Sequence, residues 1–191
     1  MKISIYIYTI KGIHLAEIDV GKGANNMEYK IRPMKEEDWN RVGSIYKQGI
    51  DGNGATFQTS VPDYKEWDEG HLKVARCVMV VDEQVVGWAA LSPTSSRPVY
   101  SGVTELSIYI DNDFKGKGIG KKLIEYVIEE SEANGIWTLY SSIMEDNEAS
   151  RALHTKCGFR EIGYREKIAK DQYGNWRNTV LYERRSKKFV D

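Results

Sequence analysis

A glycine-rich loop between a predicted strand and a predicted amphipathic helix constrains this chain more than any other feature. The loop has the sequence Lys115-Gly116-Lys117-Gly118-Ile119-Gly120. Apolar residues dominate 105–110 before it, which favours a strand, and after it Ile119, Leu123 and Val127 recur every four residues, which is typical of one face of a helix. Glycines tolerate positive φ and let a ligand approach the backbone, and a helix N-terminus attracts anions. The segment therefore predicts a phosphate or pyrophosphate site.

This loop differs from the two most common nucleotide-binding motifs. It lacks the G-x-x-x-x-G-K-[ST] spacing of a P-loop, and no serine or threonine follows that could hold magnesium. A dinucleotide fingerprint would need a βαβ unit with an acidic residue after the next strand, whereas the strand before this loop lies among predicted hairpins. From these residues alone, a plain tight turn remains the alternative to an anion site.

Length and composition limit the class of protein. The 191 residues are enough for one domain with a substantial core, and a hydrophobic fraction of 41% is typical of a soluble globular protein. The net charge of -1 provides no general attraction for nucleic acid or anionic membranes, and the apolar runs are too short for a membrane span. Cys77 and Cys157 are the only cysteines, which argues against a disulfide framework and favours a reducing cytoplasm. His14 and His71 have no partners at metal-ligand spacing, so we predict no metal site.

The periodicity of apolar residues predicts alternating strands and helices along the whole chain. Hairpins are predicted between 75–81 and 85–91 and between the last two strands, and they favour a mixed sheet covered by helices. The residues before Met27 are either an extra strand or an upstream extension of the reading frame. The predicted strands are 1–10, 29–32, 75–81, 85–91, 103–110, 137–143, 159–168 and 176–184, and the predicted helices are 38–50, 62–71, 119–134 and 147–156.

A second group of residues makes the glycine-rich loop more specific. The sequence Asn147-Glu148-Ala149-Ser150 begins a helix that carries His154 and is followed by Gly158-Phe159. Together with the loop, this pattern resembles the GNAT superfamily of acyl-CoA-dependent N-acetyltransferases. The loop of that superfamily is R/Q-x-x-G-x-G/A, which residues 115–120 match except for the lysine at the first place. The resemblance covers roughly residues 28–185.

More narrowly, the chain resembles the branch of phosphinothricin and methionine sulfoximine acetyltransferases. This resemblance implies an α/β (α+β) fold with a mixed, mostly antiparallel central sheet, flanked by about four helices and splayed at the acetyl-CoA strand. It implies one acetyltransferase domain at 27–185, preceded by an extension at 1–26 and followed by a basic tail at 186–191. The pieces that carry it are Ala55-Thr56-Phe57-Gln58-Thr59, Ser96-Arg97-Pro98, residues 105–110, Asn147 to Ser150 with Leu153-His154, and Gly174-Asn175-Trp176.

The resemblance also implies acetyl-CoA as the cofactor and assigns residues to it. Backbone amides of the loop would hold the pyrophosphate, and the backbone of the preceding strand would pair with the amide-rich pantetheine arm. Asn147 is expected to be a helix N-cap as well as a cofactor contact. The cofactor-binding residues implied in this way are Ile108, Tyr109, Ile110, Gly116, Lys117, Gly118, Ile119, Gly120, Lys121, Asn147 and Ser150.

Glu105 and His154 are the candidate catalytic residues. Glu105 lies in an otherwise apolar strand, where desolvation would raise its pKa toward the range of a general base. Its alternative role is a solvent-exposed or salt-bridged glutamate at a strand end. His154 occupies the place where many relatives have a tyrosine that protonates the departing thiolate, and histidine can do acid–base chemistry near neutral pH. The alternative is a histidine that only forms hydrogen bonds.

The resemblance implies that the Arg97-Pro98 segment contacts the substrate, and the bidentate guanidinium of Arg97 suits a carboxylate or phosphinate of the acceptor. The alternative is a solvated loop arginine. The expected reaction is acetyl transfer from acetyl-CoA to the α-amine of a small amino acid or analogue by direct attack in a ternary complex. A polyamine, an aminoglycoside or a protein N-terminus remains an alternative acceptor, and a non-catalytic acyl-CoA-binding module remains an alternative class. A cytoplasmic homodimer is expected. The predicted substrate-binding residues are Phe57, Thr59, Arg97, Pro98, Val99, Leu106 and Ser107. A core or turn role is the alternative for Phe57 and Thr59.

Overall fold

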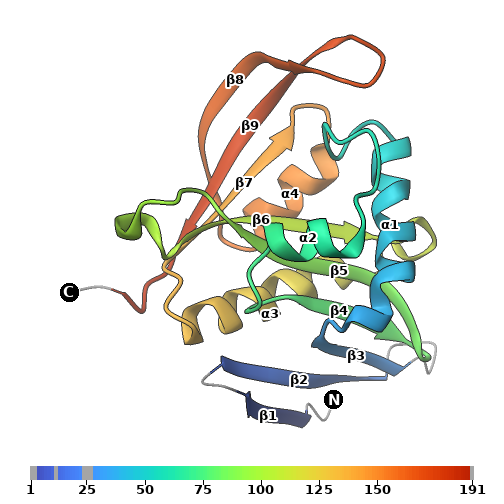
Figure 1. The fold of residues 1–191 in the computed structure, drawn as a ribbon, viewed down its shortest axis with the longest axis vertical. Helices are drawn as coiled ribbons and strands as arrows, with labels where there is room; N and C mark the ends of the chain where they lie inside the picture. Colours follow the sequence, from blue (N-terminus) through green and yellow to red (C-terminus); the bar gives the residue numbers. More distant parts are fainter. Residues whose placement is uncertain (1–3, 11–12, 23–27, 190–191) are drawn as a thin grey trace.

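One nine-stranded sheet runs through the part of the chain that the computed structural model describes, residues 4–10, 13–22 and 28–189 (Figure 1). The strand order is β1-β2-β3-β4-β5-β6-β7-β9-β8, and every neighbouring pair is antiparallel except β6 and β7. The strands are β1 (Ser4–Ile10), β2 (Ile13–Lys22), β3 (Glu28–Pro33), β4 (Cys77–Val81), β5 (Gln84–Pro93), β6 (Val103–Ile110), β7 (Thr138–Met144), β8 (Arg160–Lys170) and β9 (Trp176–Arg185).

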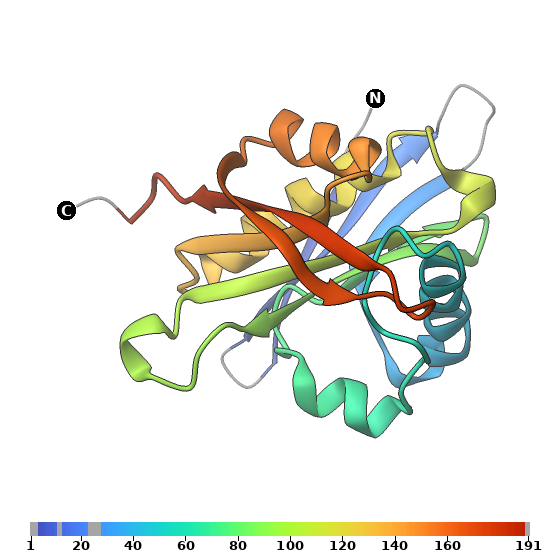
Figure 2. The ribbon, with the colours of Figure 1, turned by 90° about the horizontal axis from the view of Figure 1, so that it is seen from above.

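Four α-helices lie on the two faces of this sheet: α1 (Trp39–Asp51), α2 (Tyr64–Gly70), α3 (Ile119–Ala133) and α4 (Glu148–Lys156). Figure 2 shows α1 and α2 on one face and α3 and α4 on the other. Under α1 and α2, Ile45 and Trp67 pack with Trp88 of β5, and on the other face Leu123 and Val127 of α3 pack in the larger core. The α3 crossover connects the parallel strands β6 and β7, because such strands cannot be joined by a tight turn.

The parallel pair β6–β7 separates after a short contact. Only Val103, Thr104 and Glu105 have partners in β7, and the last pair joins Glu105 to Tyr140. Beyond this point β6 stays paired with β5 and β7 stays paired with β9 along their lengths. The backbone of β6 from 106 to 110 therefore has an edge that faces away from β5 and has no strand partner among the described residues. This is the splay that the sequence resemblance implied.

The predicted mixed, mostly antiparallel sheet with four helices is confirmed, and so are the two predicted hairpins. The prediction missed β2, which runs from Ile13 to Lys22. Strands β1 and β2 pair with each other, and β2 pairs with β3, so this part of the chain extends the same sheet. Residues 23–27, including the predicted domain start at Met27, lie outside the described residues.

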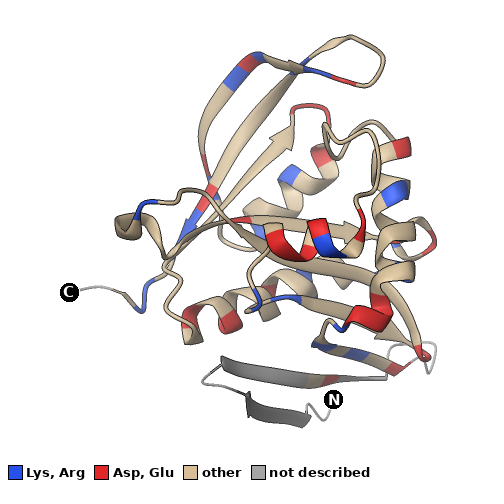
Figure 3. Cartoon of the chain, in the orientation of Figure 1, with Lys and Arg blue, Asp and Glu red and all other residues tan. Residues whose placement is uncertain are grey.

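Lys and Arg alternate with Asp and Glu along the described helices and strands in the view of Figure 3. This distribution agrees with the net charge of -1. Within the described residues, none of the helices combines the length and the apolar character that crossing a bilayer requires.

Candidate active site

The glycine-rich loop leads directly into α3 and has the backbone geometry that its sequence predicts. Gly116 and Gly118 both have positive φ, +76° and +78°, and a Cβ added to either would meet no atom within 4 Å. Gly118 is the N-cap of α3, so the first amides of the helix, beginning at Ile119, have no acceptors within the helix. Open space in front of free N–H groups at a helix N-terminus is the arrangement that binds phosphate.

A cavity of about 460 Å³ lies beside this loop and reaches the unpaired edge of β6. Lys115, Lys121 and Lys156 are among the residues that line it, which favours an anionic ligand. Of the predicted cofactor residues, all but Lys117 line this cavity, and the Lys117 ammonium lies instead 4.5 Å from the centre of the Phe114 ring. The lining residues that were not predicted are Ile45, Gly49, Ala55, Asn112, Phe114, Lys115, Ala149, Leu153 and Lys156.

A second, smaller cavity of about 90 Å³ lies in the gap between β6 and β7. Residues 106–109 of β6 and 141–144 of β7 line it, together with His154. The two cavities adjoin, because Ile108, Tyr109 and Asn147 line both of them. An extended ligand with its anionic end at the α3 N-terminus could therefore place its other end in the gap between the strands.

Asn147 holds the helix α4 against the loop that follows α1. Its side-chain oxygen accepts a hydrogen bond from the Ser150 amide at 3.1 Å, which makes it the N-cap that the sequence predicts. Its Nδ2 donates to the carbonyl of Gly54 at 2.9 Å. Both ends of the amide are thus engaged within the protein, and the residue fixes the position of two walls of the cavities.

Glu105 lies at the point where β6 and β7 begin to separate. Its side chain is half-buried on the sheet face that also carries Tyr109, which stacks on Trp88 under α1. Burial raises the pKa of Glu105, although Arg165 and a hydrogen bond from the Ser142 amide act in the opposite direction. Its neighbour Leu106 faces the other side and is buried in the larger core. Leu106 and Ser107, two of the predicted substrate residues, both line the smaller cavity.

His154 is 2% exposed and forms hydrogen bonds through both ring nitrogens. Its Nδ1 lies 2.8 Å from the Ser150 carbonyl, which can only accept, so Nδ1 carries the hydrogen. Its Nε2 lies 3.1 Å from the Ser141 hydroxyl, so Nε2 accepts from that hydroxyl. Burial lowers the pKa of His154 and keeps the ring neutral. These contacts favour the hydrogen-bonding role that the sequence left open, with the Ser141 hydroxyl held in place at the smaller cavity.

The remaining predicted substrate residues do not line any of the described cavities. Pro98 and Val99 form an exposed 3₁₀ turn, in which the Arg97 guanidinium lies over the ring of Tyr100. A third cavity of about 200 Å³ lies between α1 and α2. Gln58 and Ser60 line it, whereas their neighbours Phe57 and Thr59 do not. Sequence pattern does not show which side of an irregular loop faces inward, so the roles of Phe57 and Thr59 stay predictions.

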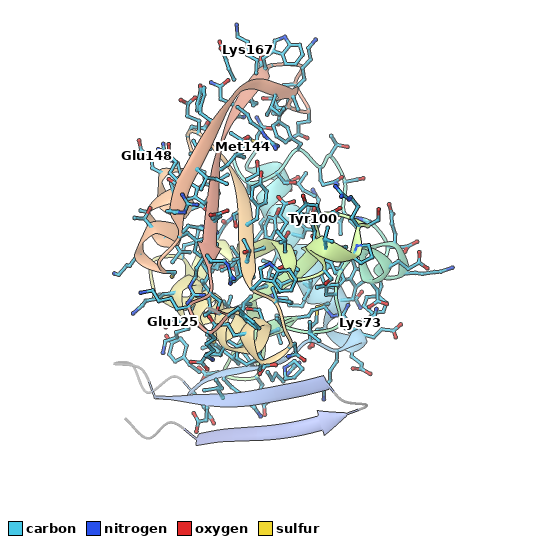
Figure 4. All side chains as sticks on the ribbon, turned by 90° about the vertical axis from the view of Figure 1, so that its left-hand side faces the viewer. Lys73, Tyr100, Glu125, Met144, Glu148 and Lys167 are labelled. Atoms are coloured by element: carbon cyan, nitrogen blue, oxygen red, sulfur yellow. The ribbon has the colours of Figure 1, made fainter. Side chains whose placement is uncertain are left out.

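The turn between β8 and β9 is tied to the end of α1. Asp171 accepts a hydrogen bond from Asn53 at 3.0 Å, and Gln172 donates to the carbonyl of Ile50 at 3.2 Å. Arg177 donates to the carbonyl of Asn53 at 2.9 Å. The Asn53 side chain and nearby amides hold the pKa of Asp171 well below its usual range. Figure 4 shows the hairpin continuing past Met144, at the end of β7, to Lys167.

Comparison with known proteins identifies the family and the fold. Residues 39–159 match the acetyltransferase (GNAT) family, so the chain belongs to this family of N-acetyltransferases, whose cofactor is acetyl-CoA. Within the family it falls in the branch of the phosphinothricin and methionine sulfoximine acetyltransferases. The phosphinothricin N-acetyltransferase of Streptomyces coelicolor is 26% identical over 165 residues, which cover 82% of this chain and 96% of that protein.

Two further proteins support this placement. The L-methionine sulfoximine/L-methionine sulfone acetyltransferase of Pseudomonas paraeruginosa is 24% identical over 156 residues, 78% of this chain and 90% of that protein. The crystal structure of a phosphinothricin acetyltransferase from Sinorhizobium meliloti, in complex with acetyl-CoA, superposes with a TM-score of 0.74 at 25% identity and covers 82% of this chain and 88% of that one.

Proposed function

We propose that this protein transfers the acetyl group of acetyl-CoA to the α-amine of a small amino acid or analogue, of the phosphinothricin or methionine sulfoximine type. The amine would attack directly, with both reactants bound at once. The position of Glu105 carries this proposal, because a half-buried carboxylate stands at the opening of the gap between β6 and β7. The names of the relatives in the same branch support the class of acceptor.

The residues of the larger cavity fit acetyl-CoA. The αL glycines leave open space before the first amides of α3, and the unpaired edge of β6 offers backbone donors and acceptors to the amides of a pantetheine arm. When bound, acetyl-CoA supplies an electrophilic thioester carbonyl and a thiolate leaving group. The protein's own contribution would be to hold the pyrophosphate at residues 115–121 and the pantetheine arm at residues 106–110. It would also leave the gap between β6 and β7 free for the thioester.

Glu105 would act as the general base. An amino acid carries an ammonium group at neutral pH, and this group must lose a proton before it can attack. Glu105 would take that proton, directly or through a water molecule. Burial raises the pKa of Glu105 above the ordinary glutamate value, which brings a carboxylate base closer to the pH at which it has to work. Since the ionised form is the active one, kcat/KM is expected to rise with pH through this raised pKa.

Substitution of Glu105 tests the proposal. Glu105→Gln is expected to lower kcat by about 10²–10⁴-fold, while the affinity for acetyl-CoA stays within about twofold. Glu129→Gln, which removes an exposed carboxylate from the outer side of α3, serves as the control and leaves both unchanged. Steady-state kinetics against a panel of amino acids and isothermal titration with acetyl-CoA provide the two measurements. An unchanged kcat and pH profile in Glu105→Gln would remove Glu105 from the mechanism.

The same panel separates the alternative functions. Turnover of polyamines or aminoglycosides in preference to amino acids would change the acceptor class. Tight binding of acetyl-CoA with no turnover of any amine would instead indicate a non-catalytic acyl-CoA-binding module. The adjoining cavities and the placement of Glu105 favour the enzyme over this last alternative, since cofactor binding alone does not need a desolvated carboxylate at the gap.

The proposal includes a cytoplasmic homodimer. Both cysteines, Cys77 and Cys157, are free, which agrees with a reducing compartment. Exposed apolar side chains gather on β8, β9 and the turn between them, where Tyr173 is 68% and Trp176 is 56% exposed. Such a concentration of apolar surface on one hairpin is typical of an interface. Light scattering of the purified chain tests the dimer, and a monomer at micromolar concentration would exclude it.

A further inference from the structure

We infer that Ser141 of β7 is a nucleophile with His154 of α4 as its base, and that this pair carries a second, slower activity. When no amine is bound, the acetyl group of acetyl-CoA passes to the Ser141 hydroxyl and is then lost to water. The inference rests on the acetyl-CoA site of the proposed function and goes beyond its amine chemistry, in which neither side chain reacts.

The contacts of His154 hold its ring in the tautomer that a base needs. Nδ1 donates to the Ser150 carbonyl at 2.8 Å, so the free lone pair of the ring lies on Nε2, 3.1 Å from the Ser141 hydroxyl. A hydroxyl, an imidazole beside it and a third group that orients the imidazole form the arrangement by which proteins activate a serine. Ser141 belongs to β7 and the other two residues belong to α4, so the pair has no local sequence signature.

Buried aromatic rings fix the imidazole in this position. The ring of Phe159 meets it edge-on with the centroids 4.9 Å apart, and the ring of Tyr182 lies 6.2 Å from it. Tyr182 of β9 is also the strand partner of Ser141. Both aromatic side chains are at most 4% exposed, and Ser141 and His154 are each 2% exposed. The pair is therefore preorganised, and bulk water has little access to the base.

The pair lies at the space that the thioester would occupy. Ser141 and His154 both line the smaller cavity, in the gap between β6 and β7. Ser150, whose carbonyl orients the imidazole, lines both this cavity and the larger one. An acetyl-CoA molecule with its pyrophosphate at the N-terminus of α3 would therefore bring its thioester toward the Ser141 hydroxyl. The unpaired edge of β6, across the gap, offers backbone amides to the oxyanion that forms during attack.

The protonation state of His154 suits a base, and its surroundings make the reaction slow. Burial lowers the pKa of the imidazole, so the ring is neutral at and above neutral pH and can accept a proton. The group that orients the ring is a neutral carbonyl, whereas a serine hydrolase uses a carboxylate, which stabilises the imidazolium that forms during attack. A bound amine that Glu105 has deprotonated is therefore expected to take the acetyl group first.

The reaction has two steps. In the first, the Ser141 oxygen forms a bond to the thioester carbonyl carbon, its proton passes to Nε2 of His154, and the carbon–sulfur bond breaks. The thiolate takes the proton from Nε2, which leaves an acetyl ester on Ser141, free coenzyme A and a neutral imidazole. In the second, water adds to the ester carbonyl and gives a proton through Nε2 to the departing serine oxygen, which releases acetic acid. Because a thiolate leaves more readily than an alkoxide, the second step is slower and the ester accumulates.

The test incubates the protein with acetyl-CoA alone and follows two quantities. Mass spectrometry of acid-quenched peptides locates acetyl groups, and a thiol reagent measures the release of coenzyme A. Wild type is expected to carry an acetyl ester on Ser141 and to release coenzyme A in a burst that precedes a slower steady rate. Hydroxylamine is expected to remove this acetyl group. It leaves the amide of an acetylated lysine intact, so the treatment distinguishes the ester from chemical acetylation of lysines.

Three variants assign the two roles. Ser141→Ala is expected to lose the ester and to release coenzyme A at least about tenfold more slowly. Ser141→Cys keeps a nucleophile and is expected to retain the acetyl group at this position. His154→Gln keeps a group that accepts from the Ser141 hydroxyl but is not a base, so ester formation is expected to slow by about 10²-fold or more.

Ser131→Ala is the matched control, because Ser131 is also a buried serine, 1% exposed, and its hydroxyl donates to the Ile128 carbonyl within α3. It is expected to form the ester at the wild-type rate. Calorimetric titration with acetyl-CoA shows that each variant keeps its fold and its cofactor site.

The outcomes separate this inference from the proposed function. If wild type binds acetyl-CoA and acetylates amines while Ser141 stays unmodified, the inference is wrong and the proposed function stands. Release of coenzyme A by Ser141→Ala at the wild-type rate would lead to the same conclusion. If Ser141 carries the ester while no amine of the panel is acetylated, the proposed function fails and the inference stands. If acetyl-CoA does not bind, both fail.

Discussion

Glu105 and His154 lie beside the same gap but on opposite faces of the sheet. Glu105 shares its face with Tyr109, under α1, whereas His154 reaches Ser141 from α4 on the other side. Burial raises the pKa of the carboxyl and lowers that of the imidazole, so it favours the neutral form of each. The consequences differ, because a less acidic carboxyl is a better base near neutral pH, whereas a neutral imidazole with its Nδ1 hydrogen already donated cannot give a proton from Nε2.

Substitution of His154 distinguishes the two roles. An acid at this position would make kcat fall as the pH rises through its pKa. Because burial lowers that pKa, we expect no such alkaline limb from His154 above its ordinary value of about 6.5. His154→Gln keeps groups that can accept from Ser141 and donate to Ser150, so kcat is expected to fall by less than about tenfold, with the pH profile unchanged. A pH–rate profile of both proteins provides the measurement, and a loss of 100-fold with disappearance of an alkaline limb would establish general acid catalysis.

Some of the candidate site could be predicted from the sequence because its signals are local. The glycines at 116 and 118 predict positive φ, and Asn147 predicts an N-cap, from neighbours within a few residues. The pairing of Glu105 with Tyr140 could not be found in this way, because it depends on the register of two strands that are far apart in the sequence. The hydrogen bond between His154 and Ser141 could not be predicted either, because His154 lies on α4 and Ser141 lies on β7.

The helices of the site are positioned by their ends. Asn147 caps α4 and also bonds to Gly54, whereas Asp63 caps α2 through the Glu66 amide at 2.8 Å without lining any described cavity. The two caps are chemically similar, and only one of them also joins two walls of the larger cavity. Substituting each cap in turn therefore distinguishes an effect on helix stability from an effect on the geometry of the site.

Asn147→Ala and Asp63→Ala are each expected to lower the free energy of unfolding by about 1 kcal/mol, as the loss of an N-cap does. Only Asn147→Ala is expected to weaken acetyl-CoA binding, by several-fold, because it releases the loop at Gly54. Urea unfolding and calorimetric titration of both variants measure the two effects. Equal affinities in the two variants would show that the contact with Gly54 has no part in shaping the cavity.

At the scale of elements, the predicted helices and most strands agree with the structure because their apolar periods are clear. The missed strand β2 contains His14, Glu17 and Asp19, and it ends in Gly21-Lys22, so its sequence gives no strong period and resembles a loop. Its strand state depends on pairing with β1 and β3. This is a tertiary effect that overrides a weak local preference.

At the scale of the whole molecule, the order of the strands in the sheet could not be predicted from the sequence. The insertion of β9 between β7 and β8 places β8 at the edge of the sheet, and the separation of β6 from β7 opens the gap. We propose that residues 27–185 are the acetyltransferase domain, with 1–26 an extension and 186–191 a tail. The alignment with the Streptomyces coelicolor relative covers 96% of that protein but only 82% of this chain. This difference in coverage supports an addition to the common domain.

The account depends most on the binding of acetyl-CoA at the N-terminus of α3, and two glycines of matched geometry test it. Gly118 and Gly135 lie at the two ends of α3, have φ of +78° and +79°, and have open space at the Cβ position. Changing either to alanine strains the backbone by about 1 kcal/mol, so both variants are expected to lose similar stability.

Isothermal titration with acetyl-CoA is the decisive measurement. Gly118→Ala places a methyl group before the free amides of the helix and is expected to raise Kd by at least about tenfold, in proportion to a lost charge-assisted hydrogen bond. Gly135→Ala is expected to leave Kd within about twofold of wild type. Equal affinities for both variants and wild type would contradict the assignment of the cofactor site.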